Sequence, residues 1–287
     1  MDLSKVNYSL YSDIIFFTTA TETSLELLSD KIGISKLTLQ NIKNGKTTTK
    51  DVLEKVYSYI YSNNYRLNKV KEEFFKEENE KVLFHGSKKG LGIINYSGSR
   101  SNCDFSNGFY LGELYDSALS FVSSFSDSSI YSFKLKNTND LQIVKFKTDI
   151  EWMLAICYFR GTIKKYENHP RIVSIINKIS NADLVIAPIA NNKMFNIMNA
   201  FANVDINQDV ALHSLSASPL GLQYVFKTEK ALNELELLER HYICEDEKAE
   251  AIKQTNNRSM EIETKLKLAK MKYKNGLFIE ELFNEGI

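Results

Sequence analysis

The sequence of 287 residues has few cysteines, no net charge and no long uncharged apolar run. Its three cysteines, Cys103, Cys157 and Cys244, are odd in number and far apart, which argues against a disulfide framework or a zinc site. The 36 basic residues equal the 36 acidic residues, so no global basic field attracts nucleic acid. There is no apolar run that spans a membrane, and no basic-then-apolar secretion signal at the N-terminus. We therefore expect a cytoplasmic protein without a membrane partner.

Several common catalytic patterns are also missing from the sequence. It contains no G-x-x-x-x-G-K-[ST] loop for nucleoside triphosphates, no G-x-G-x-x-G after a strand and no G-x-S-x-G nucleophile elbow. The four histidines, at positions 85, 169, 213 and 241, do not have the spacing of metal ligands. We expect no metal cofactor.

Residues 1–65 have the pattern of a small helical bundle. Thr23 and Glu26 form a capping box at a helix start, and Gly33 ends that helix. Ser35 caps a second short helix, and a further helix starts at Thr49. Two short helices across a glycine turn describe a helix-turn-helix, and this one resembles the Cro/repressor type.

The second of these helices would present a polar face to a partner. Its candidate contact residues are Lys36, Thr38, Gln40, Asn41 and Lys43. Such side chains can contact bases and phosphates, but they also occur on any solvated helix. Nearby acids such as Glu22 and Asp30 nearly cancel the lysines, which makes the attraction to phosphate small. DNA binding and protein docking both stay open.

The rest of the chain divides by composition into three segments. Residues 66–81 predict a charged helical linker whose charges form a solvated face. In residues 82–243 short strands are interspersed with helices, including a late strand at 222–228 and a helix over 229–241, so the class is α+β. Residues 244–287 predict charged helices, a candidate surface for a partner or for a homo-oligomer.

The stretch from Lys81 to Phe121 contains the most specific motif. The apolar run Val82–Phe84 predicts a buried strand that ends on His85, Gly86 and Ser87. A turn at Asn107 and Gly108 then leads into a strand with Phe109 and Tyr110, and Phe121 follows eleven residues after Tyr110. This order resembles the ADP-ribosyltransferase signature of the diphtheria-toxin and poly(ADP-ribose) polymerase type. More narrowly, it resembles a bacterial family of uncharacterised domains, DUF3990.

The resemblance implies an NAD site in residues 82–243. It implies that His85 binds the ribose on the nicotinamide side, that the backbone of Gly86 bonds the carboxamide and that Ser87 assists. It also implies that Tyr110 and Phe121 sandwich the nicotinamide ring beside the turn of Asn107, Gly108 and Phe109. Phe121 stands where the family has a tyrosine, so the ring face is kept but a hydroxyl is lost. Without the resemblance, a histidine at a strand end and two aromatic residues are equally compatible with a structural role.

The third element of the signature departs from the family. A glutamate usually opens the late strand, and the matching residue here is Gln223. Its neutral amide can bond the ribose 2'-hydroxyl, but it cannot act as an anionic stabiliser or a general base. We expect Gln223→Glu to keep or raise nicotinamide release. Alternatively, Gln223 is only a polar residue of an edge strand.

Together these features predict a helix-turn-helix bundle followed by an α+β domain with the ADP-ribosyltransferase fold. The implied activity is mono-ADP-ribosyl transfer from NAD, as substrate, to a macromolecular acceptor, in the setting of a bacterial toxin or phage-defence effector. Catalytic roles are expected for His85, Tyr110 and Gln223. Two alternatives stay open: a catalytically inactive, NAD-sensing DNA-binding regulator, and an NAD glycohydrolase.

Overall fold

The computed structural model describes residues 1–46, 48–216 and 220–284. These residues form two compact units, each built from separate stretches of chain. Unit 1 comprises Met1–Ile93, Ala118–Leu135 and Glu236–Lys253. Unit 2 comprises Ile94–Ser117, Lys136–Leu235 and Gln254–Ile287. The units do not follow the segment boundaries expected from composition, because a boundary read from composition does not register which distant segments pack together.

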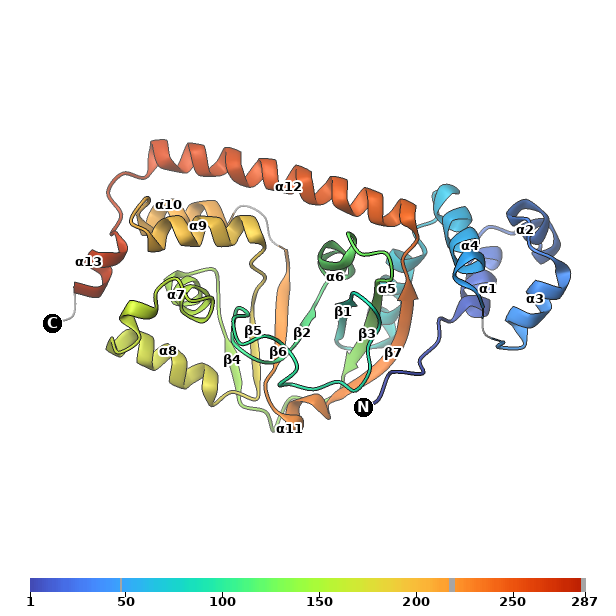
Figure 1. The fold of residues 1–287 in the computed structure, drawn as a ribbon, viewed down its shortest axis with the longest axis horizontal. Helices are drawn as coiled ribbons and strands as arrows, with labels where there is room; N and C mark the ends of the chain where they lie inside the picture. Colours follow the sequence, from blue (N-terminus) through green and yellow to red (C-terminus); the bar gives the residue numbers. More distant parts are fainter. Residues whose placement is uncertain (47, 217–219, 285–287) are drawn as a thin grey trace. The chain divides into compact units, whose positions relative to one another are not determined.

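Unit 1 combines N-terminal helices with part of the β-structure (Figure 1). Its elements are α1 (Leu10–Ala20), α2 (Leu25–Ile32), α3 (Lys36–Lys43), α4 (Lys50–Ser62), α5 (Leu67–Glu78), β1 (Val82–Ser87), β3 (Ser129–Leu135), most of α6 (Tyr115–Val122), most of β7 (Leu235–Tyr242) and the start of α12 (Glu245–Lys272). Strand β1 pairs with β3 in antiparallel fashion, with His85 opposite Tyr131, and β7 lies on the other side of β3.

Local capping explains the boundaries of α2 and α3. The Oγ atom of Ser24 accepts a hydrogen bond from the amide of Leu27 and so starts α2. The expected cap at Thr23 is thus displaced by one residue, to a side chain whose hydroxyl reaches the free amide. Gly33 ends α2 in the left-handed conformation, with φ 70°. The Oγ atom of Ser35 accepts from Thr38 and starts α3. Two short helices across a three-residue turn are therefore present.

The N-terminal helices share one hydrophobic core with the end of β7. Their buried side chains include Leu28, Val56 and Ile60, and Tyr242 and Cys244 complete the same cluster. The ring of Tyr57 stacks on Tyr242, with centroids 5.0 Å apart. Residues 1–65 supply most of this core, and Leu67, Tyr242 and Cys244 extend it beyond them.

Helix α5, expected as a solvated linker, contributes buried charge to unit 1. Lys71 is only 6% exposed and donates to both Asp13 of α1 and Glu239 of β7. The hydroxyl of Tyr57 donates to the other oxygen of Asp13 over 2.6 Å. Burial raises the pKa of Glu239. Loss of one partner from such a cluster leaves an unpaired buried charge, which is strongly destabilising.

The cluster also explains why residues 235–242 form a strand and not the expected helix. Their sequence, LELLERHY, is rich in helix formers, but α-helix α11 ends at Leu232. In the strand, Glu239 meets Lys71, and the His241 ring bonds the hydroxyl of Ser132 at 3.0 Å and the Asn68 side chain at 3.2 Å. Burial holds the pKa of His241 well below its ordinary value. Tertiary partners override local propensity here.

Unit 2 is a mixed sheet with helices packed against it. Its elements are β2 (Phe109–Gly112), β4 (Ile143–Lys145), α7 (Ile150–Phe159), the 3₁₀-helix η1 (Lys164–Tyr166), α8 (Pro170–Ser180), β5 (Leu184–Pro188), α9 (Asn192–Ala202), α10 (Gln208–Leu215), β6 (Leu222–Phe226), α11 (Glu229–Leu232), most of α12 and α13 (Ile279–Asn284). The strand order is β4-β5-β6-β2. Strand β4 is parallel to β5, and the other two pairings are antiparallel.

The core of unit 2 lies between this sheet and helices α7 to α10. Trp152 and Cys157 of α7 and Phe201 of α9 are fully buried there. Fold class α+β is confirmed by the interspersed helices and strands of both units. Among the described residues, no helix combines the length and the apolar character that a membrane crossing requires.

Candidate functional site

The residues predicted to bind NAD are divided between the two units. Unit 1 contains His85, Gly86, Ser87 and Phe121, and unit 2 contains Gln223 and the run from Asn107 to Tyr110. We call the two groups half-sites 1 and 2 because the sequence prediction assigns both to NAD, and each is described within its own unit.

Half-site 1 is built where helix α6 packs on the backbone of strand β1. A Cβ atom at Gly86 would lie 2.7 Å from the carbonyl oxygen of Ala118 and 2.8 Å from Cγ1 of Val122. Glycine is required here because the helix approaches closely, a reason that sequence reasoning did not supply. The structure thereby brings His85 and Ser87 into the same half-site as Phe121, which lies between the two contact residues of α6.

The side chains of half-site 1 differ in how much of their surface is exposed to a ligand. The ring of Phe121 is 57% exposed, although an apolar ring of this size normally gains by burial. His85 is half-buried. Ser87 is buried, and its hydroxyl donates to the carbonyl of Gly90 over 2.6 Å, which fixes the turn after the strand. The half-site therefore offers an exposed aromatic ring on the helix that packs against β1.

Half-site 2 is centred on a loop, Asp104–Gly108, that leads into β2. Ser106 has φ 66°, a left-handed conformation that is uncommon for a residue other than glycine. The hydroxyl of Tyr110 donates to the carbonyl of Ser106 over 2.6 Å and accepts from the amide of Phe105 at 3.1 Å. Burial raises the pKa of Tyr110, so its phenol stays protonated. The Tyr110 hydroxyl thus holds the loop.

Further contacts fix the same loop from outside. The ammonium group of Lys227 donates to the carbonyls of Phe105 and Asn107, each over 2.7 Å. Burial lowers the pKa of Lys227. The Asn107 side chain donates to the carbonyl of Ser99 over 2.7 Å. A Cβ atom at Gly108 would lie 2.5 Å from Cγ1 of Val225, so the loop also lies flat on β6. Strained backbone that is held this firmly is typical of functional loops.

Gln223 is buried in half-site 2 and is bonded to the loop. Strand β6 lies between β5 and β2, so the alternative that Gln223 belongs to an edge strand is wrong. Its Nε2 atom donates to Oδ2 of Asp104 over 2.9 Å and to the carbonyl of Pro188 over 3.1 Å. The other oxygen of Asp104 accepts from Nε of Arg160 over 2.7 Å. The structure thus links Gln223 and Tyr110 through one loop.

Sequence reasoning missed three side chains that hold half-site 2: Asp104, Arg160 and Lys227. They lie far apart in the chain and belong to no motif, so no local pattern marks them. The structure also contains no described group of three His, Cys, Asp or Glu side chains that could bind a metal ion.

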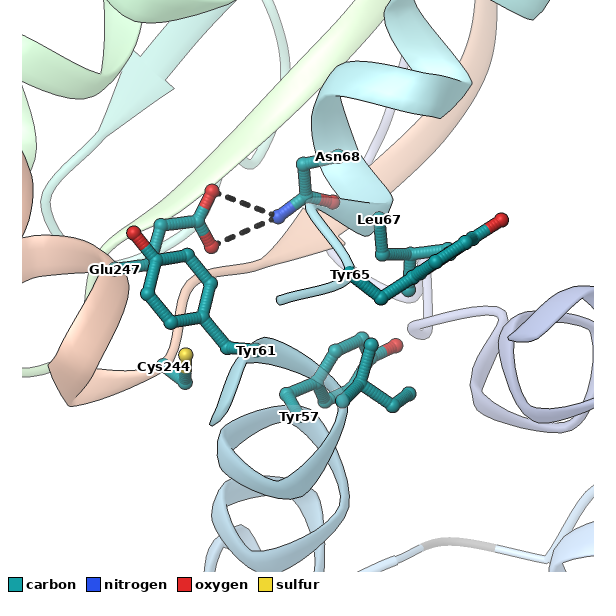
Figure 2. A pocket seen from close by; sticks show the side chains of 8 residues that line it. Tyr57, Tyr61, Tyr65, Leu67, Asn68, Cys244 and Glu247 are labelled. Atoms are coloured by element: carbon teal, nitrogen blue, oxygen red, sulfur yellow. Dashed lines mark hydrogen bonds between the residues drawn. The ribbon is translucent and has the colours of Figure 1, made fainter. Parts of the chain in front are cut away.

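A small cavity elsewhere in unit 1 contributes nothing to either half-site. It is lined by tyrosines of and after α4 together with Asn68 and Glu247, and Figure 2 shows the Asn68 amide donating to both carboxylate oxygens of Glu247. The space suits about one water molecule, which is far too little for a nucleotide.

Comparison with known proteins places the chain in a family without a known activity. Residues 81–237 match the family described as "Protein of unknown function (DUF3990)". No curated protein and no solved structure matches the chain significantly. The matched segment includes both half-sites and covers more than half of the 287 residues. The chain therefore belongs to the DUF3990 family.

Proposed function

We propose that the protein is a mono-ADP-ribosyltransferase that takes NAD as substrate, releases nicotinamide and passes ADP-ribose to a macromolecular acceptor. The observation that carries the proposal is half-site 1: helix α6 packs on Gly86 through Ala118 and Val122, and the ring of Phe121 on the same helix is 57% exposed. This arrangement suits a planar heterocycle, which would stack on the ring while His85 contacts the ribose. The signature formed by these residues resembles that of known ADP-ribosyltransferases. We propose the ADP-ribosyltransferase fold for this chain together with the activity.

In the proposed reaction the bond between nicotinamide and ribose breaks, and its electron pair goes to the nicotinamide nitrogen. The acceptor's nucleophile then bonds to the anomeric carbon and loses its proton to solvent. The protein contributes stacking, a fixed ribose and hydrogen bonds that strengthen as positive charge develops on the sugar. Because Gln223 carries no charge, it offers no base that would activate a second ADP-ribose as acceptor, which favours single-unit transfer.

Two other functions compete with transfer. The bonds of the Gln223 amino group to Asp104 and Pro188 favour a catalytically inactive NAD sensor, because they give this residue a structural role. In that case α2 and α3 would act as a helix-turn-helix that docks on DNA or on protein. NAD hydrolysis, with water as acceptor, uses the same half-sites. Both transfer and hydrolysis consume NAD, so either reaction is compatible with a toxin or a phage-defence effector.

The test is incubation of the purified protein with adenine-labelled NAD, with and without bacterial lysate. Transfer predicts free nicotinamide together with label on a macromolecule, in single units by mass spectrometry. Hydrolysis predicts free ADP-ribose only, and a sensor predicts NAD binding without nicotinamide. If millimolar NAD produces neither calorimetric heat nor a thermal shift in the folded protein, the NAD site itself is refuted.

Three variants connect the outcome to the two half-sites. We expect Phe121→Ala to weaken NAD binding about fivefold, since one ring stack is worth about 1 kcal/mol. Tyr110→Ala should weaken it more, because the variant also releases the loop at Ser106. Phe74→Ala removes a ring that is 44% exposed on α5 and serves as the matched control. Equal NAD affinity in the Phe121, Tyr110 and Phe74 variants would mean that the rings only support the fold.

A further inference from the structure

The hydrogen bonds around Gln223 determine which way its amide faces. Both partners of the amino group, the Asp104 carboxylate and the Pro188 carbonyl, are acceptors only. Only the NH₂ end of the amide can make both bonds, so the opposite end must be the carbonyl oxygen, Oε1. Pro188 also accepts from Nε1 of Trp152 over 3.2 Å, which fixes the position of its carbonyl.

Asp104 is itself held in place from its far side. Arg160 donates from Nε over 2.7 Å, and its Nη2 atom lies 2.5 Å from the same carboxylate oxygen. The guanidinium group also donates to the carbonyl of Ala190 over 3.3 Å and lies over the ring of Phe195, 4.3 Å from its centre. Asp104 is 6% exposed, so this ion pair is shielded from solvent and its geometry is fixed.

Among the described residues, no hydrogen bond engages Oε1 of Gln223. We propose that Asp104 is a positioning residue of the NAD site, which turns the Gln223 amide so that Oε1 accepts a hydrogen bond from a ribose hydroxyl. The proposal deepens the proposed function and rests on it. It assigns the ligand a hydroxyl donor at this point, and under the proposed function this donor is the 2'-hydroxyl of the nicotinamide ribose.

The same network explains why residue 223 is a glutamine in this chain. A glutamate side chain in the same position would place a carboxylate oxygen 2.9 Å from Asp104 and 3.1 Å from the Pro188 carbonyl. Two carboxylates at this separation repel, and one of them resists ionisation. The expectation from sequence that Gln223→Glu keeps or raises nicotinamide release therefore does not fit this surrounding. A neutral amide at position 223 can accept a hydrogen bond from a ligand without placing a second negative charge beside Asp104.

The first experiment compares NAD with an analogue that lacks the 2'-hydroxyl of the nicotinamide ribose. We expect the wild-type protein to bind NAD about tenfold more tightly than the analogue, the effect of one good hydrogen bond. In Asp104→Asn that preference should vanish, because an amide at position 104 cannot accept from both Arg160 and Gln223. Asp183→Asn is the matched control in unit 2, since Asp183 also accepts two hydrogen bonds, from the Gln142 amide and the Thr228 hydroxyl. That variant should keep the tenfold preference.

The second experiment needs no NAD and so separates this inference from the proposed function. We expect Gln223→Glu to unfold at a lower temperature at pH 7 than at pH 5. The Asp104 carboxylate raises the pKa of the new carboxyl group in the folded protein. The contribution of this group to the free energy of unfolding is therefore complete below an ordinary carboxyl pKa of about 4.3, and it is lost as the pH rises through the raised value. In the double variant Asp104→Asn, Gln223→Glu, an amide at 104 can accept from Arg160 and donate to the carboxylate at 223. This pH dependence should then disappear.

The two experiments separate a failure of the positioning role from a failure of the proposed function. A preference for the 2'-hydroxyl that survives in Asp104→Asn would overturn the positioning role, as would a Gln223→Glu variant with the pH dependence of the wild type. If the wild-type protein binds no NAD, the proposed function fails and the ligand role of Oε1 fails with it. The unfolding series would still decide whether Asp104 orients residue 223.

Discussion

Gly86→Ala tests whether helix α6 really lies on the end of β1. The added methyl group would meet the Ala118 carbonyl oxygen at 2.7 Å and the two methyl groups of Val122 at 2.8 and 3.3 Å. The Val122 side chain can rotate, but a backbone oxygen inside a helix cannot. The helix must therefore move away from the strand, and overpacking of this kind typically reduces the free energy of unfolding by about 1–3 kcal/mol.

The assay is chemical and thermal unfolding of Gly86→Ala beside Gly92→Ala. Gly92 follows the same strand, has no atom within 4 Å of an added Cβ and does not need a left-handed conformation. Alanine at position 92 should be neutral or stabilising by up to about 1 kcal/mol, since it restricts the unfolded chain. For a chain of this size each lost kcal/mol lowers Tm by about 2–4 °C. Equal stability of the two variants would refute the close packing that defines half-site 1.

Two further predictions concern the buried polar groups of unit 1. Because burial lowers the pKa of His241 from its ordinary 6.5, the unfolded chain binds a proton near that pH that the folded unit does not. The free energy of unfolding should thus fall as the pH drops below about 6.5, by at most about 1.4 kcal/mol per pH unit, and His241→Gln should remove this contribution from the measured slope. Deletion of residues 1–70 removes Asp13 and Tyr57 and should leave an insoluble or unfolded remainder; a folded, cooperative remainder by circular dichroism would contradict this.

Features that depend on neighbours in sequence were predictable from the sequence. Ser35 and Gly33 mark helix boundaries because a cap bonds an amide only three residues away, and a left-handed turn needs glycine locally. The strand ending at Ser87 was predictable from its apolar run. Whether these residues bind NAD stays a prediction.

Features that depend on distant partners were not predictable. Lys71 and Glu72 look solvated in a charged run, yet both are buried, because sequence shows a charge but not its counter-charge. Residues 235–242 have helical composition and form a strand because Lys71 and Ser132 meet them there. Likewise, Gln223 was recognisable as an unusual residue at its position, but its partner Asp104 lies 119 residues earlier in a loop without a motif.

The discontinuity of unit 1 affects when half-site 1 can form during synthesis. The unit needs Glu236–Lys253 as well as Met1–Ile93. Ribosomes add roughly 5–20 residues per second, so about ten to thirty seconds separate the synthesis of residue 93 from that of residue 253. For most of that interval Lys71 lacks Glu239, and the N-terminal helices lack the Tyr242 ring that completes their core. A truncated mRNA therefore yields an incomplete unit 1. Half-site 1, with His85, can fold only in chains that have been translated beyond residue 253.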